Sequence, residues 1–422
     1  MNRSHLGRDY RRVWYASAAS SLGTSVSGVV IPLIAVELFS ASPFKVSVLI
    51  AAETVPWLIF GLLAGVWVDR LSKRSLLAWS GLVRFLLFAS VPLIWLAEHL
   101  SYVYLLIVVF LAGILSVFTT VSSMAILPSV VERPQLVAAN SRLAAATTAA
   151  SVGGEGLAGV LYQWLGGPVT FVVEAITSLI GGLAARSIST PARSIENSPH
   201  SFAKQLREGF RITLRDQRFR SITIAATIQN FGEAARYALV PVFLLTVLSV
   251  EPSLFGLLVA AAGVGGLVGA ALAEPMSKWL GSGRAWRVSL VGLAIPGALI
   301  PLADTGWRLA LFPIGYFTTS LLAAVGAVVT GSARQAMCPP ELIGRLSATS
   351  RTLTWGSIPL GALFGGTIGT VLGTRTAFWS LLALPLLAWV VVKVGPLGDV
   401  RDLTDTGQPE TAAPTSPVPS AG

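Results

Sequence analysis

The amino-acid sequence predicts an all-α polytopic membrane protein whose twelve transmembrane helices form two parallel six-helix halves. Three observations lead to this fold class: few charged residues, apolar runs long enough to cross a bilayer, and an internal repeat. Of the 422 residues, 53% are hydrophobic and 12% are charged, whereas soluble domains carry about a quarter charged residues. The mean hydropathy is +0.72. This composition excludes an ordinary soluble protein.

The apolar runs have lengths of about twenty residues, as a helix that spans a bilayer requires. We expect the first six spans at 13–39, 47–69, 75–97, 102–127, 141–165 and 168–187. The other six are expected at 220–248, 253–279, 286–304, 308–333, 346–372 and 375–395. The fifth span is almost wholly small residues between Ala144 and Gly159, which suits close packing of helix backbones.

A weak repeat with an offset of 209 residues supports the division into halves. Matching positions include Gly23 with Gly232, Pro32 with Pro241, Pro43 with Pro252, and Ser141-Arg142 with Ser350-Arg351. Parallel repeats of six helices are a known transporter architecture. We therefore expect a first half at 1–187, a linker at 188–219, a second half at 220–397 and a tail at 398–422.

The linker and the tail differ in composition. In the linker, Phe202, Leu206, Phe210 and Leu214 recur every four residues with cations between them, which predicts an amphipathic helix on an anionic membrane surface. A plain spacer and a regulatory site both remain open for it. The tail is rich in Pro, Thr, Ser and Asp, so we expect it to be disordered.

Positive charge predicts the orientation in the membrane. With a cytoplasmic N-terminus, 25 of the 30 Lys and Arg residues fall on the cytoplasmic side, as the positive-inside rule requires. The sequence therefore predicts a multi-pass protein of the cell's inner membrane with both termini in the cytoplasm. The net charge of +10 is explained by this topology, so a nucleic-acid partner is not expected.

Catalysis and cofactors are not indicated. Cys338 is the single cysteine, so no disulfide forms within the chain. The sequence has no Cys/His spacing typical of a metal site, no phosphate-binding loop and no Ser/His/Asp constellation at a membrane face. We expect a non-enzyme without metal or cofactor, most simply a monomer.

The most distinctive stretch lies between the second and third spans. Asp69, Arg70, Lys73 and Arg74 place one carboxylate and three cations within six residues, just after Gly65. Because apolar runs enter and leave it, this stretch is predicted to be a cytoplasmic turn.

With its twelve spans and parallel halves, the chain resembles a major facilitator superfamily transporter. The family's signature at this turn has a Gly, an Asp-Arg pair and paired cations, which Gly65, Asp69, Arg70, Lys73 and Arg74 match; Ser72 replaces the usual second Gly. Stretches at 127–141, 206–210 and 340–351 resemble the drug-efflux branch with macrolide and siderophore exporters. The resemblance implies that the turn is a cytoplasmic gate motif, which stabilises the outward-open state.

Two features depart from the family pattern. The fourth span has no Arg, and Glu155 stands where the antiporter signature of the fifth span usually has Pro. Both positions bear on proton coupling in the family. The coupling scheme of this chain therefore rests on its own charged residues.

Charges inside spans cost at least ~2.5 kcal/mol on insertion scales and are functional candidates by default. The resemblance places the third and sixth spans outside the central cavity, so Arg84 and Glu174 are expected to be structural. The remaining candidates for proton coupling are Glu155, Glu233, Arg236 and Glu53. Glu233 and Arg236 lie three residues apart and can pair, either as a satisfied ion pair or as a switch. Glu155 is the first choice; a protonated packing group is its alternative.

Polar and aromatic residues near these positions are candidates for a substrate cavity, with plain packing as the alternative. They are Trp57, Gln229, Asn230, Tyr316 and Trp355. Together these observations predict a secondary exporter that moves a hydrophobic or amphiphilic small molecule by proton antiport. A lysolipid or nutrient carrier, and a non-transporting membrane sensor on the same fold, are the competing interpretations.

Overall fold

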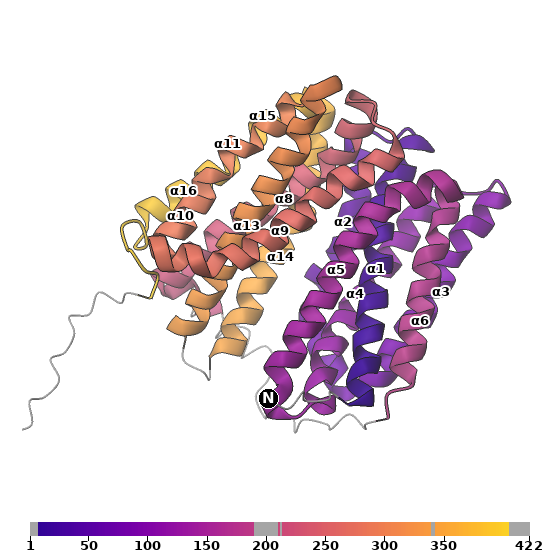
Figure 1. Cartoon of the computed structure of the whole chain (residues 1–422), viewed down its shortest axis with the longest axis horizontal. Helices are drawn as coiled ribbons and strands as arrows, with labels where there is room; N and C mark the ends of the chain where they lie inside the picture. Colours follow the sequence, from indigo (N-terminus) through magenta and orange to yellow (C-terminus); the bar gives the residue numbers. More distant parts are fainter. Residues whose placement is uncertain (1–6, 190–209, 212, 339–341, 405–422) are drawn as a thin grey trace, which may run out of the picture.

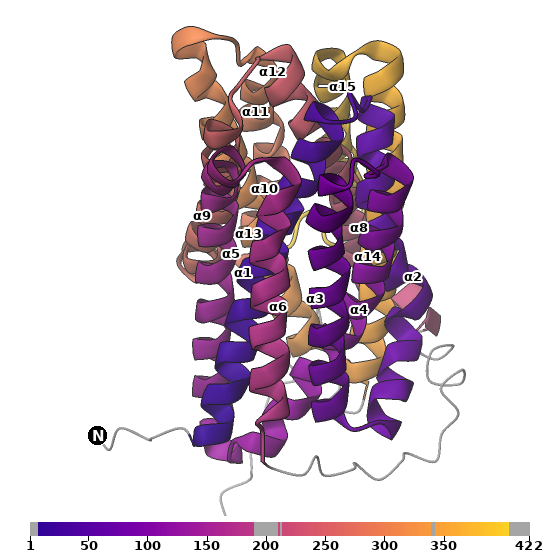
Figure 2. The ribbon, with the colours of Figure 1, turned by 90° about the vertical axis from the view of Figure 1, so that its right-hand side faces the viewer.

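The computed structural model describes residues 7–189, 210, 211, 213–338 and 342–404. Within these ranges the chain is helical and contains no β-strand. The first six long helices are α1 (Arg8–Glu37), α2 (Pro43–Arg70), α3 (Lys73–Leu96), α4 (Tyr102–Val130), α5 (Leu136–Leu165) and α6 (Phe171–Arg186). They run side by side along the molecule (Figure 2).

The remaining helices form a second group. They are α8 (Gln217–Val242), α9 (Pro252–Leu280), α10 (Ser282–Gly292), α11 (Ala294–Gly297), α12 (Leu299–Leu302), α13 (Leu311–Met337), α14 (Ile343–Leu372), α15 (Thr374–Leu381) and α16 (Ala383–Val394). Short helical turns occur at η1 (Arg133–Gln135), η2 (Gly167–Thr170), η3 (Phe243–Val247) and η4 (Gly306–Ala310). These helices cover all twelve expected spans, so the all-α membrane fold is confirmed.

Two of the expected spans are broken into shorter helices. The span at 286–304 is divided among α10, α11 and α12, and the span at 375–395 between α15 and α16. Proline explains the breaks, because it has no N–H for the carbonyl four residues earlier. Each helix ends at the residue whose carbonyl loses its hydrogen bond in this way. Gly292 ends α10 four residues before Pro296, Gly297 ends α11 before Pro301, and Leu381 ends α15 before Pro385.

Ten segments are long and apolar enough to cross a membrane, whereas α5 and α8 fall short of that hydropathy. The α5 sequence is rich in small residues, and α8 carries Gln229, Asn230, Glu233 and Arg236. Both helices are nevertheless packed within the bundle, α5 against α1 and α9 and α8 against α14. Contacts with neighbouring helices therefore hold these two less apolar helices in the bundle.

The two groups of helices meet through α2 with α14 and through α5 with α9. Glycines allow this approach: a Cβ on Gly159 would lie 2.1 Å from the Pro252 carbonyl oxygen, and one on Gly366 would lie 2.5 Å from Ser47 Cβ. These contacts lie at the end of the helix bundle that is farther in space from the start of α1. We call this end of the bundle the far side, and the end where α1 begins the N-terminal side.

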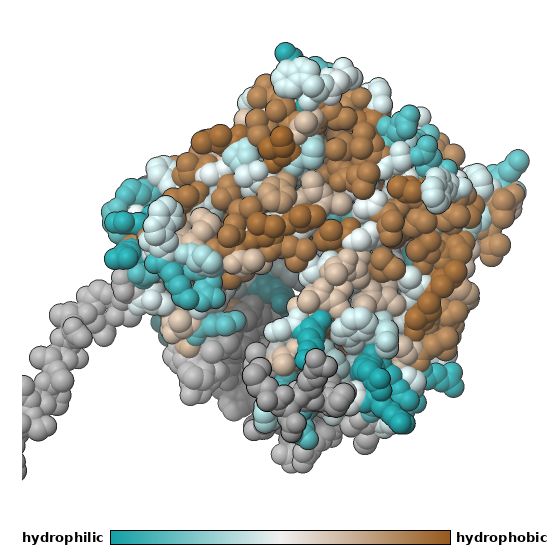
Figure 3. Space-filling model, in the orientation of Figure 1, coloured by the Kyte–Doolittle hydropathy of each residue, from teal (hydrophilic) through white to brown (hydrophobic). Residues whose placement is uncertain are grey.

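The hydrophobic core divides in the same way. One large cluster joins both halves on the far side and includes Ile34, Phe171, Phe255 and Phe378. Three smaller clusters each stay within one half, around Trp286 and Phe219 in the second half and around Tyr10 in the first. The halves are thus fused on the far side and separate on the N-terminal side, where the surface is hollowed between them (Figure 3).

The structure tests the expectation for the tail but hardly tests that for the linker. Most of the predicted amphipathic helix at 202–215 lies outside the described residues. The start of the tail, 398–404, is packed rather than disordered: Gly283 N donates to Arg401 O at 2.8 Å, Ser282 N donates to Asp402 Oδ1 at 2.8 Å, and Leu403 is fully buried. The polar composition of the tail did not predict this packing, because a segment can pack against the helices through only a few apolar side chains.

Candidate functional site

A cavity of about 390 Å³ lies within the first half, between α1, α3, α4, α5 and α6. A second cavity of about 190 Å³ shares five of its lining residues. We call the two together the hydroxyl pocket, because twelve of the residues that line it are Ser or Thr. They are Ser17, Ser20, Ser21, Thr24, Ser25, Ser116, Thr119, Thr120, Ser123, Thr147, Ser151 and Ser178.

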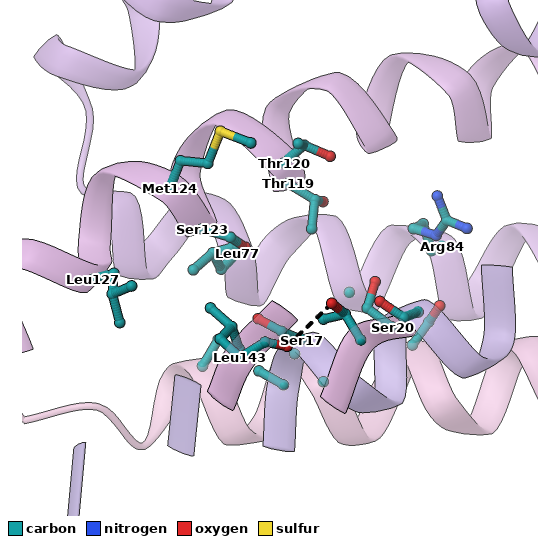
Figure 4. A pocket seen from close by; sticks show the side chains of 18 of the residues that line it. Ser17, Ser20, Leu77, Arg84, Thr119, Thr120, Ser123, Met124, Leu127 and Leu143 are labelled. Atoms are coloured by element: carbon teal, nitrogen blue, oxygen red, sulfur yellow. Dashed lines mark hydrogen bonds between the residues drawn. The ribbon is translucent and has the colours of Figure 1, made fainter. Parts of the chain in front are cut away.

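Helical spacing gathers these hydroxyls. Each set occupies one helix face because its members follow the spacing i, i+3, i+4, i+7. The sets are residues 17, 20, 21 and 24 on α1, and 116, 119, 120 and 123 on α4. In Figure 4, Arg84 lies at one end of the pocket, while Met124, Leu127 and Leu143 lie toward the other. The apolar end is on the N-terminal side, where α4 ends and α5 begins. The pocket can therefore hold a molecule with a hydrogen-bonding part and an apolar part.

Arg84 is fixed at the polar end by a buried network. Its Nε donates to Glu174 Oε1 at 3.1 Å, and its Nη2 donates to the same oxygen at 2.5 Å and to Thr24 Oγ1 at 3.0 Å. Its Nη1 donates to the Ala112 carbonyl at 3.3 Å. Arg84 and Glu174 are both buried, so their charges compensate each other. The pair joins α3 to α6, and Arg84 also forms part of the pocket wall.

Glu155 occupies a different place, at the contact between the halves. Its Oε2 faces α9, where a Cβ on Gly263 would lie 3.4 Å away. Tyr237 and Tyr316, from the second half, interact electrostatically with it. Within the described residues, the half-buried Glu155 carboxylate has no hydrogen bond and no ion pair. Glu155 therefore places an unpaired carboxylate at the contact between α5 and α9.

The other charged candidates lie near cations. Glu233 and Arg236 form the ion pair within α8 that their spacing predicts. Glu53 on α2 lies within electrostatic reach of Arg84 and Glu174. Glu155 is therefore the candidate without a compensating cation.

The expected cavity residues do not line the hydroxyl pocket. Trp57 and Trp355 meet edge to face across the halves, with ring centroids 4.8 Å apart. Asn230 Nδ2 donates to the Thr354 carbonyl at 3.2 Å, and Tyr316 is buried against Phe312.

Gln229 lines a pocket of only about 20 Å³ beside Glu233 and Arg236. The aromatic and amide residues thus do not mark the hydroxyl pocket, and their place in a substrate cavity stays a prediction. The helical spacing of Ser and Thr in the first and fourth spans is the signal that could have revealed it.

The gate motif is described in part. The α2 helix ends at Arg70, and Ser72 Oγ caps α3 by accepting from Ser75 N at 3.4 Å. Lys73 is buried, whereas Arg74 is exposed. The structure does not describe the surroundings of Gly65 or the side chains of Asp69 and Arg70.

The fold and the two halves are those of a major facilitator superfamily transporter. The chain belongs to the family described as transmembrane secretion effector, which matches residues 7–411. It is 25% identical over 394 residues to the multidrug efflux pump Tap of Mycolicibacterium fortuitum, covering 90% of this chain and 94% of that protein. It is 26% identical over 375 residues to the uncharacterized MFS-type transporter y4rN of Sinorhizobium fredii, covering 84% of this chain and 87% of that protein.

Solved structures share the fold at low identity. A single-residue variant of the nucleoside transporter NupG superposes with a TM-score of 0.78 at 10% identity, covering 91% of this chain and 98% of that one. A bacterial homologue of the iron transporter ferroportin in the inward-facing state gives 0.73 at 16% identity, and one in the outward-facing state gives 0.60 at 18%. The inward-facing structure covers 92% of this chain and the outward-facing one 91%; 98% of each of those chains is matched.

Proposed function

We propose that this chain is a secondary exporter that moves a hydrophobic or amphiphilic small molecule out of the cell by proton antiport with alternating access. The family match and the similarity to a multidrug efflux pump support export. The positive-inside count supports an inner-membrane location with both termini in the cytoplasm. In this orientation, the N-terminal side of the molecule is cytoplasmic and the far side is external.

The conformation then corresponds to an inward-open state. The helices are fused on the external side through Gly159 and Gly366, and the innermost ring contact between α2 and α14 is that of Trp57 with Trp355. The higher TM-score with the inward-facing than with the outward-facing ferroportin homologue supports this assignment. The gate motif, Asp69 above all, is proposed to close the cytoplasmic side in the opposite state.

The observation that carries proton coupling is the unpaired carboxylate of Glu155 at the contact between α5 and α9. Opening the external side separates these helices, so the surroundings of Glu155 change with access. A carboxylate that is protonated in one state and ionised in the other links proton movement to the conformational change. Glu53 and Glu233 are weaker candidates because cations lie close to each.

The substrate is proposed to bind in the hydroxyl pocket, whose described lining presents no uncompensated charge. Its single charged lining residue among those described, Arg84, is compensated by Glu174. Hydroxyls would bind the polar part of the substrate, and Met124 and Leu127 its apolar part.

Glu155→Gln tests the coupling. The amide mimics the protonated acid permanently, so we expect pH-driven flux in proteoliposomes to fall at least tenfold while substrate exchange without a gradient continues. Glu274→Gln is the matched control, because Glu274 is an exposed carboxylate paired with Lys278. Full proton-driven flux in Glu155→Gln would reject Glu155 as the coupling group. Loss of exchange as well would assign it to substrate binding or folding instead.

A further inference from the structure

A groove on the outer face of the first half lies between α3 and α6, away from the second half. Figure 2 shows these helices side by side on this face, and Figure 1 places them at the edge of the molecule. The groove has a volume of about 370 Å³. Its floor is the contact of the two backbones, because a Cβ on Gly81 would lie 2.6 Å from Gly182 Cα. This floor separates the groove from the hydroxyl pocket.

One end of the groove carries two cations. Arg74 is the second residue of α3 and Arg186 is the last residue of α6, and both line the groove and are exposed. Neither has an ion-pair partner among the described residues. The only carboxylate on either helix is Glu174, which is buried and bound to Arg84 on the other side of the floor. The positive charge at this end is therefore not compensated by these helices.

The rest of the groove is apolar and faces outward. Its walls include Trp79, Leu82, Leu179 and Leu183. Trp79 is 65% exposed and Leu183 57% exposed. Leu82 lies eight residues from Arg74, which is about 12 Å along a helix. A surface of this kind in a membrane protein faces acyl chains, and tryptophan is typical of the depth at which headgroups meet them.

We infer that this groove binds an anionic phospholipid of the leaflet on the N-terminal side. The lipid phosphate would lie between Arg74 and Arg186, and an acyl chain would lie along Leu82 and Leu183. Guanidinium groups suit this role because they donate two parallel hydrogen bonds to phosphate oxygens. Basic pockets between transmembrane helices bind acidic headgroups in this way.

The test compares lipids on the purified full chain. Phosphatidylglycerol or phosphatidylcholine is titrated into the detergent-solubilised protein, and retained lipid is counted by native mass spectrometry. We expect preferential retention of phosphatidylglycerol, with an affinity that falls roughly tenfold or more in the double variant Arg74→Gln, Arg186→Gln. Arg284→Gln is the matched control. It removes an exposed cation from the start of α10, on the same side of the membrane.

A second variant guards against misfolding. Arg74→Lys with Arg186→Lys keeps both charges but loses the two-pronged hydrogen bonding, so it should bind phosphatidylglycerol with intermediate affinity. Unchanged retention in the glutamine pair, or an equal loss in Arg284→Gln, would overturn the proposal. Thermal stabilisation by inorganic phosphate equal to that by phosphatidylglycerol would also overturn it, because it indicates an ion site. A dimer mass that is lost in the glutamine pair would overturn it as well, because it indicates contact with a second copy of the chain.

Discussion

The buried pair of Arg84 and Glu174 combines a structural role with a place in the pocket wall. Intramembrane charges are retained when they are paired and hydrogen-bonded, and here one guanidinium makes four hydrogen bonds to three partners. Family resemblance assigned the third and sixth helices to the periphery, which predicted the structural role alone. The wall position follows from the direction of the Arg84 side chain, which helix numbering does not give.

Replacing one member of this pair should lower the stability of the protein far more than replacing both. Glu174→Leu leaves a buried guanidinium uncompensated and should lower stability by about 3–5 kcal/mol. The double variant Arg84→Met, Glu174→Leu should recover most of that loss, because no unpaired charge remains. Thermal unfolding of the purified protein in detergent measures both. A double variant as unstable as the single one would show that the pair acts through more than charge compensation.

At the scale of elements, the segment after α16 connects distant parts of the second half. Arg287 Nη1 on α10 donates to the carbonyls of Leu397 and Val400, at 2.8 and 3.0 Å. Lys393 on α16 pairs with Asp399 and lowers the pKa of that carboxyl below its ordinary value. A lowered pKa in the folded state stabilises at neutral pH, and this contribution is lost as the pH falls through the folded pKa. The segment therefore links α10 to the end of α16.

Leu403→Ala tests whether this segment matters for stability. Leu403 is fully buried beside Trp286 and Val392 in the core of the second half, so truncation should cost about 3 kcal/mol. The unfolding midpoint in detergent should fall clearly below that of Val394→Ala, a control at a site that is 83% exposed. Equal midpoints would mean that the segment is docked without contributing to stability.

At the scale of the whole molecule, the closure of the far side, which is proposed to be external, depends on how closely α5 and α9 approach. Gly159 lies against the backbone of residues 252–256. A Cβ placed on Gly159 would be 3.0 Å from Gly256 N. Backbone atoms cannot move aside as a flexible side chain can. A larger residue at this position therefore has to separate the two halves.

Gly159→Leu should shift the population toward the state that is open externally. Spin labels on Trp164→Cys and Leu254→Cys, near the external ends of α5 and α9, should report a longer distance, with Cys338→Ser as background. Gly153→Leu is the control on the same helix, because no atom lies within 4 Å of a Cβ placed there. An unchanged distance in Gly159→Leu would contradict the assignment of this contact as the external closure.

Much of the fold was predictable from sequence because a bilayer permits few solutions. Apolar runs of sufficient length must become helices, since lipid cannot satisfy backbone hydrogen bonds. The composition, the twelve spans and the repeat therefore determined the architecture. The charged turn at 65–74 indicated the superfamily, and Glu155 could be singled out as a charge without a cation nearby in sequence.

Only the tertiary structure decided where the cavity lies and which groups face each other. Whether Gln229 faces a cavity or a neighbouring helix depends on helix rotation and crossing, which periodicity does not fix. The hydroxyl pocket arises where five helices meet, and the groove between α3 and α6 arises because two glycines bring these helices into contact. Sequence determined which segments enter the membrane, since that depends on local hydropathy. The sites depend on contacts between residues far apart in the chain, which only packing brings together.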